Sequence, residues 1–302
     1  IRYLEEHVFL KRNLIQIDKF KHPEIELEVL VADQTQSHAV NNVLADLSLD
    51  YVKAFTCEPI DAGWPIDLGA QKASGEYFIS FDVDCAPIHK AWAYLPIYLI
   101  DKHNISAVGK STGLQEAESY KALGNFFHIN NYYRIMRTRN VRKLSEDVGF
   151  MRYENRYKAN FTPKVNTNWN VSCDNGVVAQ WYSDQINMGP KVSLALNKIN
   201  GMTNKMGVFG MVIDDLIWHM VFSSSKDWIN NKFDVLGHEY MFWYKRINDE
   251  GFTDEIFNEL ISKLVPHHSV LFDREIFENG VLRKLTPQDS IFQEIHSIKN
   301  EV

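Results

Sequence analysis

Two aspartates separated by one residue, Asp82 and Asp84, have side chains and a spacing that suit metal binding. They follow the apolar run Tyr77–Phe81, which predicts a buried strand. In an extended segment, residues i and i+2 lie on one face, so we expect both carboxylates to face one point while Val83 packs inward. Hard oxygen ligands on a loop suit Mg²⁺ or Mn²⁺, which also bind phosphate oxygens. The alternative is a solvated turn, since such pairs also arise by chance.

A second strand-end acid, Asp33, strengthens this interpretation because it follows the strand predicted over residues 25–32. Short β-branched runs alternate with helical patterns along the first 110 residues, which is typical of a parallel, helix-covered sheet. The predicted strands are 25–32, 51–55, 77–81 and 105–108, and the predicted helices are 37–47, 65–74 and 89–102. Open α/β sheets bind ligands at the carboxyl edge of their strands, so we expect Asp33 and Asp82 at that edge of one sheet.

The rest of the chain divides into three patterns. Residues 114–163 are aromatic, basic and irregular, which suggests an insertion or an acceptor-side region. A helical tail is predicted from residue 251, with an amphipathic helix near 256–264 and a polar helix from about residue 288. We therefore predict a domain over residues 1–250, with halves 1–110 and 111–250, and a helical C-terminal extension over 251–302.

Two segments, residues 61–70 and 73–84, resemble the inverting family-2-type glycosyltransferases. In that family a strand ending in Asp binds the nucleotide base, and a helix ending in Ala-x-Gly-Glu-Tyr leads into the strand with the metal aspartates. The resemblance implies the GT-A fold, a Rossmann-like, mostly parallel mixed sheet covered by helices. It also implies that Asp33, Asp67, Lys72 and Asp82 contact the nucleotide-sugar. Lys72 is included because Ile66 stands where many members carry an arginine near the diphosphate.

The resemblance continues at residues 200–206, at Gly210 and at Asp214 and Asp215, which are similar to the family's Gly-Gly-Phe-Asp-Glu segment and its Glu-Asp pair. The second acid of that pair is the catalytic base, so the resemblance assigns this role to Asp215, with Asp214 next in line. A helix over 216–222 would make N-capping the alternative role of Asp215.

The resemblance also places His238 where the family often has a metal-ligating histidine, so Asp82, Asp84 and His238 form the expected metal site. The alternatives are that His238 packs in the core, and that His267 or His268 serves as the ligand instead. Trp218 is the aromatic residue singled out as a platform for sugar stacking.

The activity implied is transfer of a sugar, with inversion, from a nucleotide diphosphate donor to a glycan or another hydroxyl acceptor, as in polysaccharide biosynthesis. A UDP-sugar is the favoured donor, with Mn²⁺ or Mg²⁺ as cofactor. One alternative is a sugar nucleotidyltransferase, although the basic, Gly-rich phosphate loop expected of that class is not visible. The other alternative is a catalytically inactive module that binds glycans or acts as a scaffold.

Composition excludes some classes of partner and suggests a compartment. The net charge of −7 argues against a nucleic-acid-binding protein, which needs clustered Lys and Arg. The basic run 134–143 is read either as a solvated helix face or as a contact with an anionic membrane surface. The three cysteines form no CxxC pair, and no apolar run reaches the ~20 residues of a membrane span. We expect a cytoplasmic protein, with peripheral membrane contact as a further expectation.

Overall fold

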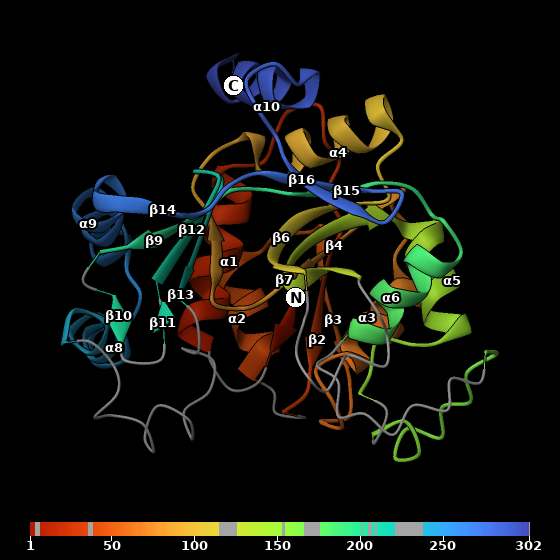
Figure 1. Ribbon diagram of the computed structural model, residues 1–302. Coiled ribbons are helices and arrows are strands. Elements are labelled where there is room, and N and C mark those ends of the chain that lie inside the picture. Colours follow the sequence, from red (N-terminus) through yellow and green to blue (C-terminus); the bar gives the residue numbers. More distant parts are fainter. Residues whose placement is uncertain are drawn as a thin grey trace.

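A computed structural model describes the protein over residues 1–3, 7–35, 39–114, 126–152, 155–165, 176–200, 202–204, 207–208, 210–220 and 238–301. Helices and strands together form a mixed α/β structure (Figure 1). The helices are α1 (His7–Lys19), α2 (Ala39–Leu47), α3 (Trp64–Lys72), α4 (Ala91–His103), α5 (Thr138–Asp147), α6 (Val177–Gln185), α8 (His238–Glu250), α9 (Asp254–Leu264) and α10 (Ser290–Glu301), with the 3₁₀ turn η4 (Val265–His267).

A small parallel sheet carries Asp33 at the end of its central strand. It contains β1 (Arg2–Tyr3), β2 (Val29–Asp33) and β3 (Val52–Thr56), in that order. The strand predicted from residue 25 begins at Val29, because β3 pairs with β2 only from Val52 onward, opposite Val29. Helix α3 agrees with the predicted helix near 65–74, since Pro65 at its first turn fits a helix start.

A six-stranded sheet carries the strand before the aspartate pair. Its order is β16 (Val281–Lys284), β15 (Glu275–Glu278), β8 (Lys191–Ser193), β6 (Ala107–Leu114), β7 (Phe127–Arg137) and β4 (Tyr77–Phe81). Within it β6 and β8 are parallel, and the other neighbours are antiparallel. The mostly parallel sheet that we predicted is therefore not seen in the described residues. The cause is β7, which returns between β4 and β6 from within the region predicted to be irregular.

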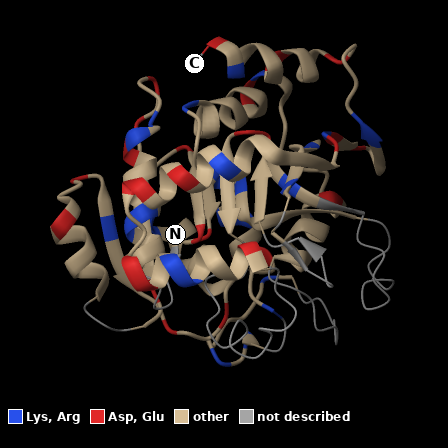
Figure 2. Cartoon of the chain, turned by 90° about the vertical axis from the view of Figure 1, so that its left-hand side faces the viewer, with Lys and Arg blue, Asp and Glu red and all other residues tan. Residues whose placement is uncertain are grey.

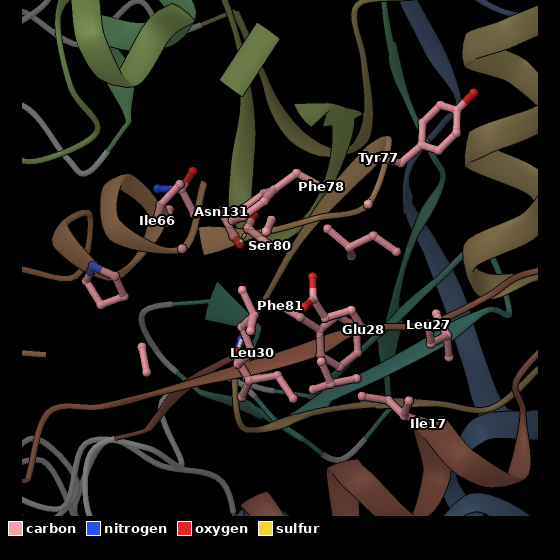
Figure 3. A pocket seen from close by; sticks show the side chains of 18 of the residues that line it. Ile17, Leu27, Glu28, Leu30, Ile66, Tyr77, Phe78, Ser80, Phe81 and Asn131 are labelled. Atoms are coloured by element: carbon pink, nitrogen blue, oxygen red, sulfur yellow. Dashed lines mark hydrogen bonds between the residues drawn. The ribbon is translucent and has the colours of Figure 1, made fainter. Parts of the chain in front are cut away.

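The expectation that Asp33 and Asp82 lie at one edge of a single sheet is wrong for the described residues. Strand β2 belongs to the three-stranded sheet, whereas β4 is the last strand of the six-stranded sheet. A cavity of about 640 Å³ lies between them, lined by residues of both strands. Figure 3 shows side chains of both walls, with Leu27, Glu28 and Leu30 on one and Phe78 and Ser80 on the other.

An antiparallel five-stranded sheet contributes the second half of the candidate site. Its order is β14 (His268–Phe272), β9 (Leu196–Ile199), β12 (Gly210–Ile213), β13 (Ile217–Met220) and β5 (Cys85–Pro87); a two-stranded ribbon pairs β10 (Thr203–Asn204) with β11 (Gly207–Val208). The helix predicted over 216–222 is wrong, because residues 217–220 form strand β13. Asp214 and Asp215 have φ values of 48° and 58°, and Leu216 N donates to Ile213 O at 2.8 Å. Positive φ at both central residues defines the type I′ turn that joins hairpin strands.

One hydrophobic core joins the first and last parts of the chain. It includes Leu10 of α1, Leu95 of α4, Trp243 of α8, Leu260 of α9 and Ile295 of α10. The tail after residue 251 is not purely helical, because β14 and β15 extend two sheets. Strand β6 runs across the predicted boundary at residue 110, and the domain boundaries themselves remain predictions.

The basic run 134–143 is used largely for internal contacts. Arg134 is 2% exposed, and its guanidinium lies 4.7 Å from the centre of the Phe150 ring. Arg137 pairs with Glu76 and Asp101, and Arg142 donates to two carbonyls at the end of α3. In the view of Figure 2, basic and acidic residues are interspersed. None of the helices in the described residues is both long and apolar enough to cross a membrane.

Candidate functional site

The turn between β4 and β5 holds Asp82, Val83 and Asp84 by bonds to its backbone. Asp82 N donates to Tyr132 O at 3.1 Å, and Cys85 N donates back to Asp82 O at 3.1 Å. From α1, Asn13 Nδ2 donates to Asp82 O at 3.1 Å. The segment is thus a tight turn rather than an extended strand. Asp82 is half-buried while Asp84 is only 2% exposed, so the two carboxylates have different surroundings.

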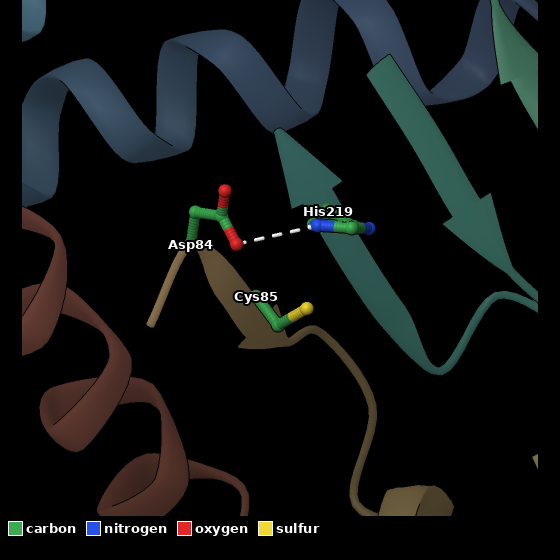
Figure 4. A group of neighbouring side chains, drawn as sticks. All are labelled: Asp84, Cys85 and His219. Atoms are coloured by element: carbon green, nitrogen blue, oxygen red, sulfur yellow. Dashed lines mark ion pairs between the residues drawn. The ribbon is translucent and has the colours of Figure 1, made fainter. Parts of the chain in front are cut away.

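The carboxylate of Asp84 meets an imidazole from the neighbouring hairpin. His219 of β13 lies opposite Cys85 of β5 in the antiparallel ladder, which places both side chains on one face. His219 Nε2 is 3.2 Å from Asp84 Oδ1. Ligand atoms of Asp84, Cys85 and His219 all lie within 4.8 Å of one another, and all three residues are buried (Figure 4). These are the three ligand types found in sites for divalent transition metals.

The surroundings of this cluster are apolar and aromatic. The His219 ring packs at 4.6 Å from the Tyr132 ring, and the Cys85 thiol donates to Tyr132 O at 3.5 Å. Burial, together with the charges of Asp84 and Asp82, holds the pKa of Cys85 well above its usual value, so the thiol is neutral at pH 7. Burial and the charge of Asp84 likewise raise the pKa of Tyr240 in α8.

The histidines proposed from the sequence lie elsewhere. His238 is the first residue of α8 and is exposed, and the buried residue in the same turn is Tyr240. His268 Nε2 is 3.0 Å from Asp215 Oδ1, which ties it to the β12–β13 turn. His219 was missed, although a single imidazole in the apolar run from Leu216 to Met220 was a usable signal. A buried polar group costs free energy unless it has a partner, so such a histidine points to one.

Asp33 stands at the end of β2, as predicted, and closes a local turn. It is 7% exposed, and its Oδ1 accepts from Thr35 N at 2.9 Å and from Thr35 Oγ1 at 2.7 Å. The next residue, Gln34, donates to the carbonyls of Glu58 and Asp61 at 3.1 and 3.3 Å. The carboxyl end of β2 is therefore joined to the loop that leads into α3.

That loop is in close contact with the chain around Phe150. Asp61 Oδ1 accepts from Gly63 N at 2.7 Å, and Asp61 Oδ2 accepts from Asn155 Nδ2 at 2.7 Å. A Cβ on Gly63 would lie 2.1 Å from Phe150 O, so no other residue fits there without moving the backbone. Asp67 is fully enclosed, and both of its oxygens accept from Phe150 N, at 3.1 and 3.0 Å.

Lys72, the other residue of α3 expected to contact the donor, ends the helix and is exposed. Its ammonium lies 5.5 Å from the centre of the Phe55 ring. The donor contacts expected of Asp67 and Lys72 remain predictions.

Asp215 and Asp214 are bound by the C-terminal tail. Asp214 is 1% exposed and receives two bonds from Arg274, at 2.7 and 2.5 Å, while Lys299 bridges both aspartates at 3.0 and 2.8 Å. Asp215 is half-exposed and lies in the turn before β13, four residues before His219 in the sequence. With no helix after it, the N-cap alternative for Asp215 is wrong. Its role as a base remains a prediction.

Trp218 does not form a sugar platform. It is 1% exposed, and its ring meets the edges of Phe252 and Phe257, with centroids 5.7 and 6.0 Å away. Its indole therefore belongs to the hydrophobic core, whereas a stacking platform must be open to the ligand.

The comparison with solved structures includes a distant structural likeness. No protein-family model matches the sequence, and a search of curated proteins finds no match. Part of the chain is similar to the mannosyltransferase PcManGT from Pyrobaculum calidifontis in complex with GDP-Man and Mn²⁺, with 16% identity and a TM-score of 0.39. The match covers 49% of this chain and 45% of that chain, so the chain spans less than half of that protein's length. So distant a likeness carries no argument about function.

Proposed function

We propose that the protein is a glycosyltransferase that uses a divalent cation, held by Asp84 and His219, to transfer a sugar from a nucleotide diphosphate donor to a hydroxyl acceptor. The observation that carries the proposal is the buried pair of Asp84 and His219. Asp84 lies in the turn after β4, whose sequence resembles the metal strand of family-2-type enzymes, and His219 lies in the neighbouring strand β13. As that resemblance implies, the donor is a UDP-sugar and transfer inverts the anomeric carbon.

The donor set fits such a cation. A carboxylate oxygen and an imidazole nitrogen suit Mn²⁺ better than Mg²⁺, which prefers oxygen ligands alone. When bound, the cation would neutralise charge on the departing nucleotide diphosphate. Asp82, half-buried at the same turn, would bind the ribose, and Asp33 at the end of β2 would bind the base.

The reaction also needs a base near the acceptor. The acceptor hydroxyl attacks the anomeric carbon, the bond from that carbon to the diphosphate breaks, and the hydroxyl proton passes to a carboxylate. Asp215 is the base that the resemblance implies. Because Asp215 lies in the turn that precedes β13 while His219 lies within that strand, Asp215 can act only if the donor sugar and acceptor extend toward the turn.

Binding measurements test the cation site directly. UDP-, GDP-, dTDP- and CMP-sugars are screened by thermal shift with and without Mn²⁺, because a ligand that binds only the native state raises the melting temperature. We expect the wild type to respond to one donor class, and more strongly with Mn²⁺. Asp84→Ala and His219→Ala should lose the Mn²⁺-dependent part of the response, measured for each variant relative to its own melting temperature without ligand.

The matched variant is His238→Ala, which removes the ligand expected from the sequence. It should respond like the wild type if His219 is the ligand. Loss of the Mn²⁺ effect in His238→Ala but not in His219→Ala would overturn the assignment. Release of nucleotide diphosphate then tests the reaction, and donor binding without release would instead indicate a binding module.

A further inference from the structure

Cys85 belongs to the buried cluster of Asp84 and His219 but has no part in the proposed cation site. It lies opposite His219 in the ladder between β5 and β13 (Figure 4). Met220 N donates to Asp84 O at 3.1 Å, so the neighbouring pair of Asp84 and Met220 is a hydrogen-bonded one. Because hydrogen-bonded and non-hydrogen-bonded pairs alternate, Cys85 and His219 form a non-hydrogen-bonded pair, the kind whose side chains lie closest together.

The separations of the three ligand atoms fit one small cation. His219 Nε2 is 3.2 Å from Asp84 Oδ1, and Cys85 Sγ lies within 4.8 Å of both atoms. Metal bonds of about 2.0–2.1 Å to nitrogen and oxygen and about 2.3 Å to sulfur, at tetrahedral angles, place ligand atoms about 3.3–3.6 Å apart. The nitrogen and oxygen already have this separation, and the sulfur reaches it by a shift of roughly 1 Å, which rotation about the Cα–Cβ bond provides.

Burial and ligand type distinguish this cluster from a site for magnesium or manganese. The three residues are only 1–3% exposed, which leaves little room for the several waters that a hard cation keeps. Thiolate ligands favour soft or borderline metals such as zinc, and sites with nitrogen, oxygen and sulfur ligands generally bind Zn²⁺ more tightly than Mn²⁺. A zinc ion with three protein ligands keeps its fourth position for water or substrate.

We infer that Cys85 is a third ligand of the cation site and that the site binds Zn²⁺ in preference to Mn²⁺. The inference rests on the cation site of the proposed function, but not on sugar transfer. Binding breaks the S–H bond of Cys85 and forms a bond from sulfur to the metal, while the proton passes to solvent. The alternative is that the thiol only fills space, as a small apolar group beside an Asp–His pair.

Cobalt reports the thiolate directly. Co²⁺ replaces Zn²⁺ in such sites, and its bond to a thiolate gives a charge-transfer absorption band that oxygen and nitrogen ligands do not give. The whole protein is titrated with Co²⁺ without donor, and we expect the band in the wild type and its loss in Cys85→Ala. The matched control is Cys57→Ala, which removes the other buried cysteine of the described residues and should keep the band.

Calorimetry measures the metal preference. We expect Cys85→Ala to weaken Zn²⁺ binding by at least about 100-fold, because loss of a group that only orients a ligand already costs about 10–100-fold. The affinity for Mn²⁺ should change much less, since Mn²⁺ gains little from a thiolate. Cys85→Ser retains the size of the side chain and should lose the cobalt band as well, so that the result does not depend on a cavity at position 85.

The outcomes separate this inference from the proposed function. A wild-type cobalt spectrum without the band, a band that survives in Cys85→Ala, or equal Zn²⁺ affinity of the wild type and that variant would overturn the inference. The cobalt band together with no response to any nucleotide-sugar would support the inference and count against sugar transfer. If neither Co²⁺ nor Zn²⁺ binds, both the inference and the proposed cation site are wrong.

Discussion

Asp67 provides a quantitative test because its carboxyl group is completely buried. Burial raises the pKa of Asp67 to about 7, although bonds from Phe150 N and the charge of Arg156 act in the opposite direction. The perturbation is Asp67→Asn, which keeps the shape of the side chain and an acceptor for Phe150 N but cannot ionise.

The expected magnitude follows from the two pKa values. In the unfolded chain the group has a pKa of 3.8, so between pH 3.8 and about 7 the native state holds a proton that the unfolded state has released. The free energy of unfolding therefore falls as pH rises, by about 1.4 kcal/mol per pH unit. The difference of 7 − 3.8, about 3 units, corresponds to about 4 kcal/mol. This stabilisation is complete below pH 3.8 and is lost once pH passes about 7.

Urea unfolding of wild type and Asp67→Asn between about pH 5 and pH 8 measures the difference, and other titrating groups cancel in the subtraction. We expect the wild type to lose about 3 kcal/mol relative to the variant over this range. Parallel pH profiles would refute the reasoning. Calorimetry of donor binding with the same variant tests the predicted donor contact, since a specific loss of affinity at unchanged stability would support it.

Three further substitutions test other parts of the structure. Arg274→Met leaves the buried carboxylate of Asp214 with one cationic partner fewer, so we expect a loss of about 3–5 kcal/mol in urea unfolding, and Asp214→Asn in the same chain should restore part of it. Thr253→Ala removes the side chain that caps α9 and should cost about 1 kcal/mol. Asp215→Asn should lower turnover ~10²–10⁴-fold at unchanged donor affinity if Asp215 is the base, and unchanged steady-state turnover would reject that role.

The local elements before the aspartate pair were predictable because their signals lie within a few residues. Strand Tyr77–Phe81 was predicted with the bounds that the structure has, and α3 begins one residue before Pro65. By contrast, His219 is the only polar residue in the run Ile217–Met220. In so short an apolar run, periodicity does not distinguish a helix from a strand. The Asp214-Asp215 pair favours a hairpin turn over a helix start, because aspartate tolerates the positive φ of a type I′ turn.

The partner of Asp84 could not be predicted from spacing, because it depends on which strand pairs with β5. His219 is distant in sequence and reaches Asp84 only because β13 lies beside β5 with His219 opposite Cys85. The order of strands in the six-stranded sheet likewise could not be predicted from spacing, because it depends on which strands pair. Strand β7 enters between β4 and β6, and this pairing across the fold overrides the parallel arrangement that the alternating pattern favoured.

The turn of Asp82 and Asp84 is held by hydrogen bonds to its backbone, and these bonds do not depend on the aspartate side chains. Asn13, Tyr132 and Met220 all bond to backbone atoms of Asp82 or Asp84, and such bonds would form with other side chains at these two positions. Folding of the turn therefore does not require a carboxylate at position 84. Burying one costs several kcal/mol unless positive charge accompanies it. His219 supplies that charge only when it is protonated, whereas a divalent cation shared by the two side chains would supply it with the imidazole neutral, which favours a cation-binding role for the pair.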